Sequence, residues 1–203
     1  MTPRFIACQL SRPTGIPGTL MAHLMNRRNA RMNHFALGQL NVKMTDRVLE
    51  IGFGGGVILS HLVENAGFVV GLDRSADVIR RARRKFARAV AGGRAAFHDG
   101  EVEALPFDTP SFEKVITVNT VYFWKSLEQG FRECHRVLVP TGLLVVGFLP
   151  KHHMDRMGVP ADIFTSRTLE ETVAAIEKAG FAEVRVEKPR ANTAWMMIVA
   201  ARL

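Results

Sequence analysis

Short apolar runs alternate with segments of helical periodicity along most of the chain. The apolar runs predict strands over residues 47–51, 68–72, 95–98, 115–118, 143–148, 183–187 and 194–200. Apolar residues at helical spacing predict helices over residues 57–65, 76–91, 127–138 and 169–179, the last with a capping-box spacing at Thr168 and Glu171. This alternation is typical of an α/β fold with a doubly wound, mostly parallel sheet and helices on both faces. Because no helix separates the last two of the seven strands, we expect them to form an antiparallel hairpin at one edge.

The N-terminal part precedes this alternation. Residues 1–18 read as an arm interrupted by three prolines, and apolar spacing between residues 19 and 40 predicts one or two amphipathic helices. We therefore expect a single domain over residues 1–203. Its residues 1–41 would form an arm and lid helices, and residues 42–203 a Rossmann-like core.

Composition sets a few further limits. The chain has 203 residues, enough for one domain with a sizeable core, and no apolar run reaches the roughly 20 residues that span a bilayer. Pro and Arg residues interrupt the N-terminal stretch, where a secretion signal needs continuous apolar residues. Cys8 and Cys134 are too few to suggest a disulfide framework or a metal site. We expect a protein of the reducing cytoplasm that carries no metal.

The charge distribution marks two basic segments. The net charge is +8, and up to Lys43 there are six Lys or Arg residues and no carboxylate. The second segment lies in one predicted helix and contains Arg80, Arg81, Arg83, Arg84, Lys85 and Arg88. Such segments are most often solvated helix faces, but they also attract anionic partners. Nucleic acid, anionic lipid and an acidic substrate are the alternatives that the charge leaves open.

A glycine-rich turn, GFGGGV, follows the first predicted strand directly and leads into a helix. Glycine allows positive φ and has no Cβ to hold a ligand away from the backbone. The helix that follows contributes the positive end of its dipole. These features predict a nucleoside site at the carboxyl end of the strand, where ligands bind in open α/β sheets.

The glycine spacing separates two classes of cofactor. The dinucleotide fingerprint G-x-G-x-x-G fails, because Val57 stands where a pattern starting at Gly52 needs its third glycine. The pattern that fits is E-x-G-x-G-x-G, through Glu50, Gly52, Gly54 and Gly56. A carboxylate at Glu50 suits a cationic amino-acid group, and Asp73, at the end of the next strand, can accept both hydroxyls of a ribose.

Several segments, in order, resemble the class I S-adenosylmethionine-dependent methyltransferases, in the small-molecule branch that includes quinone-biosynthesis enzymes. VLEIGFGGG resembles the family's first motif, and GLD resembles its ribose-binding acid. GEVEALPFDTPSFEKV is similar to the family's G-D-A-E-A-L-P-F segment with the acidic loop and fourth strand. HRVLVPTGLLVV resembles the helix, Pro-x-Gly turn and fifth strand. The resemblance covers residues 46–150 well and implies S-adenosylmethionine as cofactor, with S-adenosylhomocysteine as product.

The resemblance also implies which residues contact the cofactor. Glu50 is expected near the methionine part, Asp73 on the ribose, and Glu101 with the Val102 amide beside the adenine, with Asp99 as the alternative to Glu101. Asn119 and Thr120 are expected to flank the sulfonium and the substrate. The full expected set is Glu50, Gly52, Phe53, Gly54, Gly56, Asp73, Arg74, Gly100, Glu101, Val102, Asn119 and Thr120.

The substrate side is less defined, because the resemblance names no invariant catalytic residue. Weak candidates for a catalytic base are Tyr122, His152 and His153. Tyr122 and Trp124 follow the fourth strand, and Arg31 and Phe35 belong to the expected lid; all four are candidate substrate contacts. The segment around the paired histidines is expected to be a surface loop, and no third metal ligand lies near them.

The first functional hypothesis is methyl transfer to a small, anionic or aromatic acceptor, achieved mainly by positioning and desolvation. One alternative is an RNA methyltransferase that uses the basic N-terminal arm. A second is a protein that binds S-adenosylmethionine without turnover. The glycine spacing disfavours an NAD-dependent oxidoreductase. The methyl acceptor and the oligomeric state stay open.

Overall fold

The strands form one seven-stranded sheet in the order β3-β2-β1-β4-β5-β7-β6. The computed structural model describes residues 2–190 and 192–203, so Met1 of the predicted arm lies outside the described residues. The strands are β1 (Arg47–Ile51), β2 (Phe68–Asp73), β3 (Ala95–Asp99), β4 (Phe112–Val118), β5 (Leu138–Phe148), β6 (Ala182–Glu187) and β7 (Met196–Ala201). Strands β1 to β5 run parallel, and β7 lies antiparallel between β5 and β6. The predicted doubly wound α/β fold with antiparallel final strands is confirmed.

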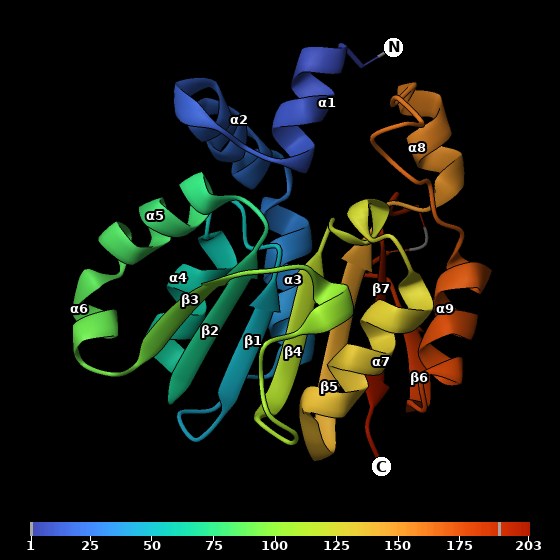
Figure 1. Ribbon diagram of the computed structural model, residues 1–203. Coiled ribbons are helices and arrows are strands. Elements are labelled where there is room, and N and C mark those ends of the chain that lie inside the picture. The colour runs from blue at the N-terminus through green and yellow to red at the C-terminus, as the bar shows by residue number, and fades with distance from the viewer. Residues whose placement is uncertain (1, 191) are drawn as a thin grey trace.

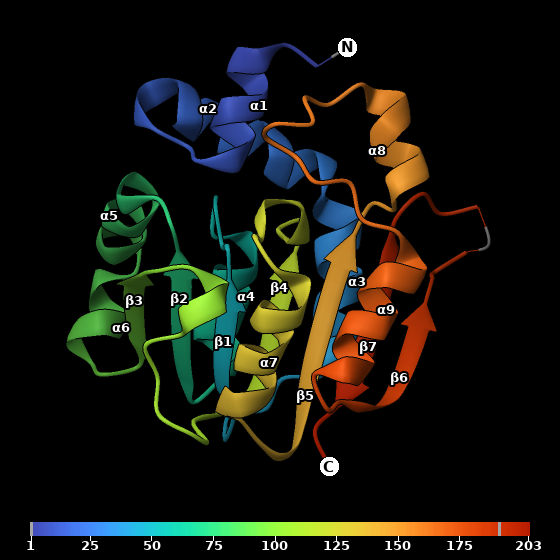
Figure 2. The ribbon, with the colours of Figure 1, turned by 45° about the vertical axis from the view of Figure 1, so that its right-hand side comes forward.

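Helices cover both faces of the sheet and its carboxyl edge (Figures 1 and 2). On one face lie α3 (Ala30–Leu40), α4 (Val57–Asn65), α5 (Ala76–Lys85) and α6 (Ala87–Ala91). On the other face lie α7 (Leu127–Val137) and α9 (Leu169–Lys178), together with the short 3₁₀ turns η1 (Val102–Ala104) and η2 (Val121–Phe123). Above the carboxyl ends of the strands lie α1 (Arg4–Ser11), α2 (Gly15–Arg28) and α8 (Lys151–Met157). Among the described residues, no helix has both the length and the apolar character needed to cross a membrane.

Strand β1 contributes side chains to two apolar cores, one on each face of the sheet. Leu49 and Ile51 belong to the core beneath α7 and α9, which is centred on the fully buried Phe131. Val48 belongs to the core beneath α3, α4 and α5, which contains Leu62. This alternation follows from the period of two along a strand that is covered on both faces.

The order of the strands creates a crevice beside β1. From β1 the chain adds β2 and then β3 on one side, and it returns to place β4 on the other side of β1. The loops that leave β1 and β4 therefore diverge toward opposite faces of the sheet. In open α/β sheets, ligands bind at such a reversal point, outside the carboxyl ends of the strands.

Two core elements differ from the prediction in their extent. The helix predicted over residues 76–91 is divided at Phe86, whose ring stacks on Phe97 at a centroid distance of 5.8 Å. Strand β5 begins at Leu138 rather than at residue 143, because the predicted turn forms an irregularity within the strand. There Thr141 adopts a φ of 66°. Pairing with β4 continues on both sides of it.

Two segments outside the core also differ from the prediction. Most of the predicted arm is helical, as α1 and the first turn of α2. Its prolines fit this, because Pro3 directly precedes α1, Pro13 lies between the helices, and Pro17 occupies the first turn of α2, where a missing amide costs little. The predicted surface loop after β5 contains α8, which ends at Gly158 in the left-handed conformation.

Candidate functional site

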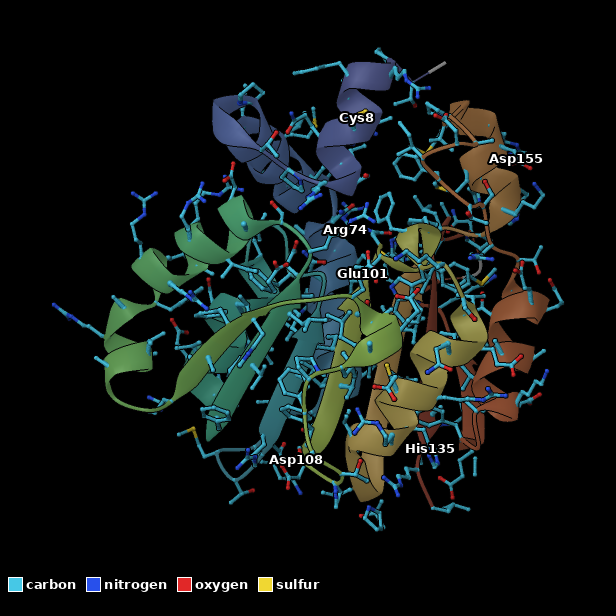
Figure 3. The ribbon with its side chains drawn as sticks, viewed as in Figure 1. Cys8, Arg74, Glu101, Asp108, His135 and Asp155 are labelled. Carbon is cyan, nitrogen blue, oxygen red and sulfur yellow. The ribbon has the colours of Figure 1, made fainter. Side chains whose placement is uncertain are left out.

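A cavity with a volume of about 120 Å³, open to solvent, lies at the carboxyl ends of β1, β2 and β4. The predicted residues that line it are Gly52, Gly54, Asp73, Arg74, Gly100, Glu101, Val102, Asn119, Thr120 and Trp124. Figure 3 shows Arg74 and Glu101 at this edge of the sheet, below α1. The topology thus brings together ten residues from four separate segments of the sequence.

The glycine turn forms one wall of this cavity. Gly52 has a φ of 71°, and a Cβ at this position would lie 2.4 Å from Cγ2 of Thr120. Gly54 has a φ of 46°, with no atom within 4 Å of the place of its Cβ. Bare backbone at Gly54 therefore borders open space. Gly56, which does not line the cavity, is the N-cap of α4, also with positive φ.

Asp73 connects the glycine turn to the end of β2. Its Oδ2 accepts a hydrogen bond from the Gly54 amide at 3.0 Å, and its Oδ1 accepts one from the Ser75 amide at 2.9 Å. Burial raises the pKa of Asp73, while these two amides and the cations Arg74 and Arg81 act in the opposite direction. Because a carboxylate oxygen has more than one lone pair, each oxygen can still accept a hydrogen bond from a ligand.

Glu50 does not line the cavity, although a contact with the cofactor was expected. Its side chain is buried, and the Leu59 amide in the first turn of α4 acts to lower its pKa. Among the described residues, Oε2 of Glu50 has no hydrogen-bond partner. Burial, and then the charge of Asp73, raise the pKa of Glu50 well above its ordinary value.

The raised pKa leads to a testable dependence of stability on pH. The folded protein keeps the proton on Glu50 to a higher pH than the unfolded protein does. The protonated side chain therefore stabilises the fold fully below pH 4.5, the ordinary pKa of Glu, and this contribution is lost as the pH rises through the higher pKa of the folded state. Glu50→Gln removes this loss. We expect the variant to gain stability over the parent with rising pH, by up to about 1.4 kcal/mol per pH unit. Thermal unfolding measured between about pH 5 and 8 checks this, with the exposed Glu177→Gln as control. A pH-independent difference would contradict it.

Two carboxylates lie at the tip of β3 and just after it. Asp99 is paired in register with Asp73 and is exposed, but it does not line the main cavity. Glu101 lines the cavity and forms an ion pair with Lys125. Val102, which is buried and also lines the cavity, begins η1. These positions favour Glu101 over Asp99 as the acid that faces a ligand.

Asn119 and Thr120 follow β4 and face the glycine turn. Asn119 has a φ of 59°, a conformation that Asn tolerates better than most residues. Its Oδ1 accepts a hydrogen bond from the Tyr122 hydroxyl at 3.1 Å. The Thr120 hydroxyl is bonded to that of Thr117, which in turn donates to the Ile51 carbonyl at 3.1 Å. The side chains at the end of β4 are therefore held in place before any ligand binds.

Five other predicted contacts lie away from the cavity. Tyr122 is buried, and its hydroxyl accepts a hydrogen bond from the Leu149 amide in addition to its bond with Asn119. Burial raises the pKa of Tyr122, which favours its protonated form. The other members of this group are Phe53, which packs on Phe97, Phe35, which packs on Trp195, the exposed Arg31, and Gly56.

The paired histidines do not reach the cavity either. His152 and His153 lie on α8 with their ring centroids 4.1 Å apart. Burial, and then His152, Arg156 and Lys188, lower the pKa of His153. In the described part of the chain, no group of three or more His, Cys, Asp or Glu side chains is arranged to hold a metal ion.

The cavity also has a wall that the sequence did not predict. Leu10, Ser11 and Pro13, at the end of α1 and just after it, line it from above. The guanidinium of Arg74 donates to the Ser11 carbonyl at 2.8 Å, and the Ser75 hydroxyl donates to the Pro13 carbonyl at 2.6 Å. We call α1 and α2 the N-terminal lid. Since these contacts are made between distant segments, no local pattern could have identified them.

Three of the six cations in the basic segment, Arg80, Arg83 and Lys85, make contacts within the protein. Arg83 donates to the Phe97 carbonyl at 2.7 Å, and Arg80 pairs with Asp77. Lys85 donates to the Ser60 hydroxyl at 2.9 Å. These contacts join α5 to β3 and to α4, which leaves fewer free cations on this helix for an outside partner.

Comparisons with known proteins agree with this geometry. A family model described as a methyltransferase domain matches residues 49–146. The uncharacterised methyltransferase YdaC of Bacillus subtilis is 24% identical over 173 residues, which cover 83% of this chain and 89% of that protein. The chloroplastic 2-methyl-6-phytyl-1,4-hydroquinone methyltransferase 1 of Oryza sativa is 27% identical over 148 residues. That alignment covers 70% of this chain but only 43% of the plant protein.

A solved structure has the same fold over its whole length. The methyltransferase partner of the Trm112 activator from Haloferax volcanii superposes with a TM-score of 0.75 at 18% identity. The superposition covers 99% of this chain and 98% of that one. The chain therefore carries a match to a methyltransferase domain over residues 49–146, and it has the Rossmann-like fold of the class I S-adenosylmethionine-dependent methyltransferases.

Proposed function

We propose that this protein transfers the methyl group of S-adenosylmethionine to a small-molecule acceptor in the cavity beside β1. One observation carries the proposal. The Gly54 amide donates to the Asp73 carboxylate at 3.0 Å, so bare backbone and a hydroxyl-binding acid face the same cavity. Glu101 and Val102 extend this surface toward the next strand.

The residues of the cavity fit such a cofactor. Open space at the missing Cβ of Gly54 allows a ligand to lie against the main chain. Asp73 is suited to the ribose hydroxyls, and Glu101 to an exocyclic amino group. Trp124 and the ring of Phe123 supply apolar surface on the remaining side. The spacing of the glycines does not match the dinucleotide fingerprint.

When bound, the cofactor supplies an activated methyl group on a positively charged sulfur. The residues of the chain would hold both reactants in line and exclude water. Such positioning contributes up to roughly 7–11 kcal/mol in well-oriented systems. Asn119 and Thr120 are held by hydrogen bonds at the end of β4, where they would flank the reacting groups. No cavity-lining residue among those described above is needed as a general base if the acceptor loses its proton readily.

A small acceptor is favoured over RNA. The N-terminal lid covers the cavity from above, and Ser11 is held against it by Arg74. The basic helix makes contacts within the protein rather than presenting a continuous cationic groove. The plant relative named above methylates a hydroquinone, as its name states, which supports a flat, aromatic acceptor.

Calorimetry and a turnover assay test the proposal. The full chain is expected to bind S-adenosylmethionine and S-adenosylhomocysteine at a single site. With a panel of quinols, phenols, amines and thiols, at least one acceptor should produce S-adenosylhomocysteine. A folded sample that binds neither cofactor would overturn the proposal. Binding without turnover on any acceptor would instead favour the non-catalytic alternative.

A further inference from the structure

The N-terminal lid carries exposed apolar side chains that its position over the cavity does not require. Phe5 is 62% exposed on α1, while Leu20 and Leu24 are 70% and 49% exposed on α2. Ala7, by contrast, is buried, so α1 already has an inner face toward the core. Large exposed apolar side chains gathered on neighbouring elements indicate an interaction surface.

Cations accompany these apolar side chains, and carboxylates do not. Leu20, Leu24, Arg27 and Arg28 have the spacing of one helical face along α2. Both arginines are exposed, as is Arg12, and among the described residues none of the three side chains forms an ion pair or hydrogen bond. No Asp or Glu precedes Asp46 in the sequence. The outer surface of the lid is therefore both apolar and cationic.

Helix α8 extends this surface on the same side of the molecule. Figures 1 and 2 show α1, α2 and α8 together above the carboxyl ends of the strands. The Thr2 hydroxyl donates to the Met157 carbonyl at 3.0 Å, which joins α1 to the end of α8. Met157 is 42% exposed, and its neighbour Arg156 is also exposed. The exposed carboxylates on α8 and just after it are paired, Asp155 with Lys151 and Asp162 with Arg4. This face thus combines apolar side chains with cations that outnumber its carboxylates.

We propose that this face, formed by α1, α2 and α8, docks on the surface of an anionic lipid bilayer. Apolar side chains would enter the headgroup region, while the arginines would meet lipid phosphates with their stems along the apolar boundary. Each cation close to an anionic surface strengthens the attraction to the lipid. Such docking does not require methyl transfer. It would place the lid side of the cavity against the membrane.

The charge and chemistry of the face favour a bilayer over other occupants. A second copy of the chain would bring like charges together, which is unfavourable. Nucleic acid would use the arginines, but it gains little from exposed Leu and Phe side chains. An anionic bilayer satisfies both components at once.

Vesicle sedimentation with the full chain tests the docking. Binding is expected to vesicles of phosphatidylcholine mixed with phosphatidylglycerol, to weaken with salt, and to be much weaker for phosphatidylcholine alone. Leu20→Ser/Leu24→Ser and, separately, Arg27→Gln/Arg28→Gln should each lower the affinity by roughly tenfold or more. Calorimetry with S-adenosylmethionine shows whether each variant remains folded. If the Leu variant does not fold, the Arg variant alone decides.

Matched controls separate this face from general properties of the protein. Met44→Ser removes an apolar side chain that is 61% exposed in the loop before β1, away from the lid. Arg84→Gln/Arg88→Gln removes the same charge from exposed positions on α5 and α6. Both controls should bind anionic vesicles as the parent does. Equal loss in these controls, binding indifferent to lipid charge, or lid-dependent dimers without vesicle binding would overturn the proposal. Binding of a structured RNA that depends on Arg27 and Arg28 but not on Leu20, without vesicle binding, would overturn it too.

Discussion

Asp73→Ala is expected to weaken the binding of S-adenosylmethionine by at least roughly a hundredfold, because two charge-assisted hydrogen bonds to a ribose would be lost. The same change leaves the buried amide of Ser75 and the partly buried amide of Gly54 without their acceptor. Each such loss costs about 1–3 kcal/mol of folding stability. Calorimetry measures the first effect, and thermal unfolding the second.

Two further variants separate binding from folding. Asp73→Asn retains one acceptor oxygen and the shape of the side chain, so we expect a smaller loss of stability but still a large loss of affinity. Asp108 is exposed at the opposite end of the sheet (Figure 3), and Asp108→Ala should change neither quantity. If stable Asp73→Asn protein bound the cofactor as tightly as the parent, the assignment of the cavity would be wrong.

Alanine at Gly52 and at Gly54 should have different consequences. At Gly52 the new Cβ would meet Cγ2 of Thr120 at 2.4 Å, and the residue would also hold a φ of 71°. Conformation costs about 1–2 kcal/mol and overpacking about 1–3 kcal/mol, so we expect a loss of roughly 2–5 kcal/mol in stability. At Gly54 nothing lies within 4 Å, so only the conformational cost applies. There the added methyl group would instead occupy cavity space, and cofactor affinity should fall by more than stability does.

A double variant tests the cause assigned at Gly52. Thr120→Ser removes the methyl group that a new Cβ would meet, so Gly52→Ala/Thr120→Ser should recover the overpacking part of the loss but not the conformational part. Gly38→Ala serves as a control, because Gly38 lies in α3 with open space around its Cβ position. It should be neutral or slightly stabilising. Equal destabilisation by alanine at positions 38 and 52 would contradict the argument.

The core of the fold could be read from the sequence because its signals are local. All seven strands were predicted, since β1 to β5 are covered on both faces and show as short apolar runs. The capping box of α9 was also predicted, and both of its hydrogen bonds are present. Most of the cavity-lining residues could be predicted from their positions at the ends of strands, because parallel strands bring their carboxyl ends to the same edge of the sheet. Those positions agree with the expected cofactor contacts, which stay predictions until a ligand is bound.

Features that depend on distant contacts could not be read in this way. Glu50 is expected near the methionine part of the cofactor, but its side chain is buried and does not line the cavity, so that contact stays a prediction. Phe53 lies in the glycine turn, but it packs against β2 at Gly71, where a Cβ would come within 2.8 Å of its ring. The helical arm and α8 were missed because their prolines lie at helix ends, where proline is tolerated. In each case tertiary packing decided the outcome.

One short turn after β2 performs two tasks. Asp73 faces the cavity, while the next residues, Arg74 and Ser75, hold the end of α1, and Asp77 accepts a hydrogen bond from the Gly15 amide. A ligand that binds Asp73 and stabilises this turn therefore also stabilises the docking of α1 on the turn. Because the coupling is reciprocal, the docking of α1 strengthens ligand binding by the same free energy. The expected kinetic consequence is an order of addition, in which the nucleoside binds first and its residence time lengthens once the entrance has closed over it.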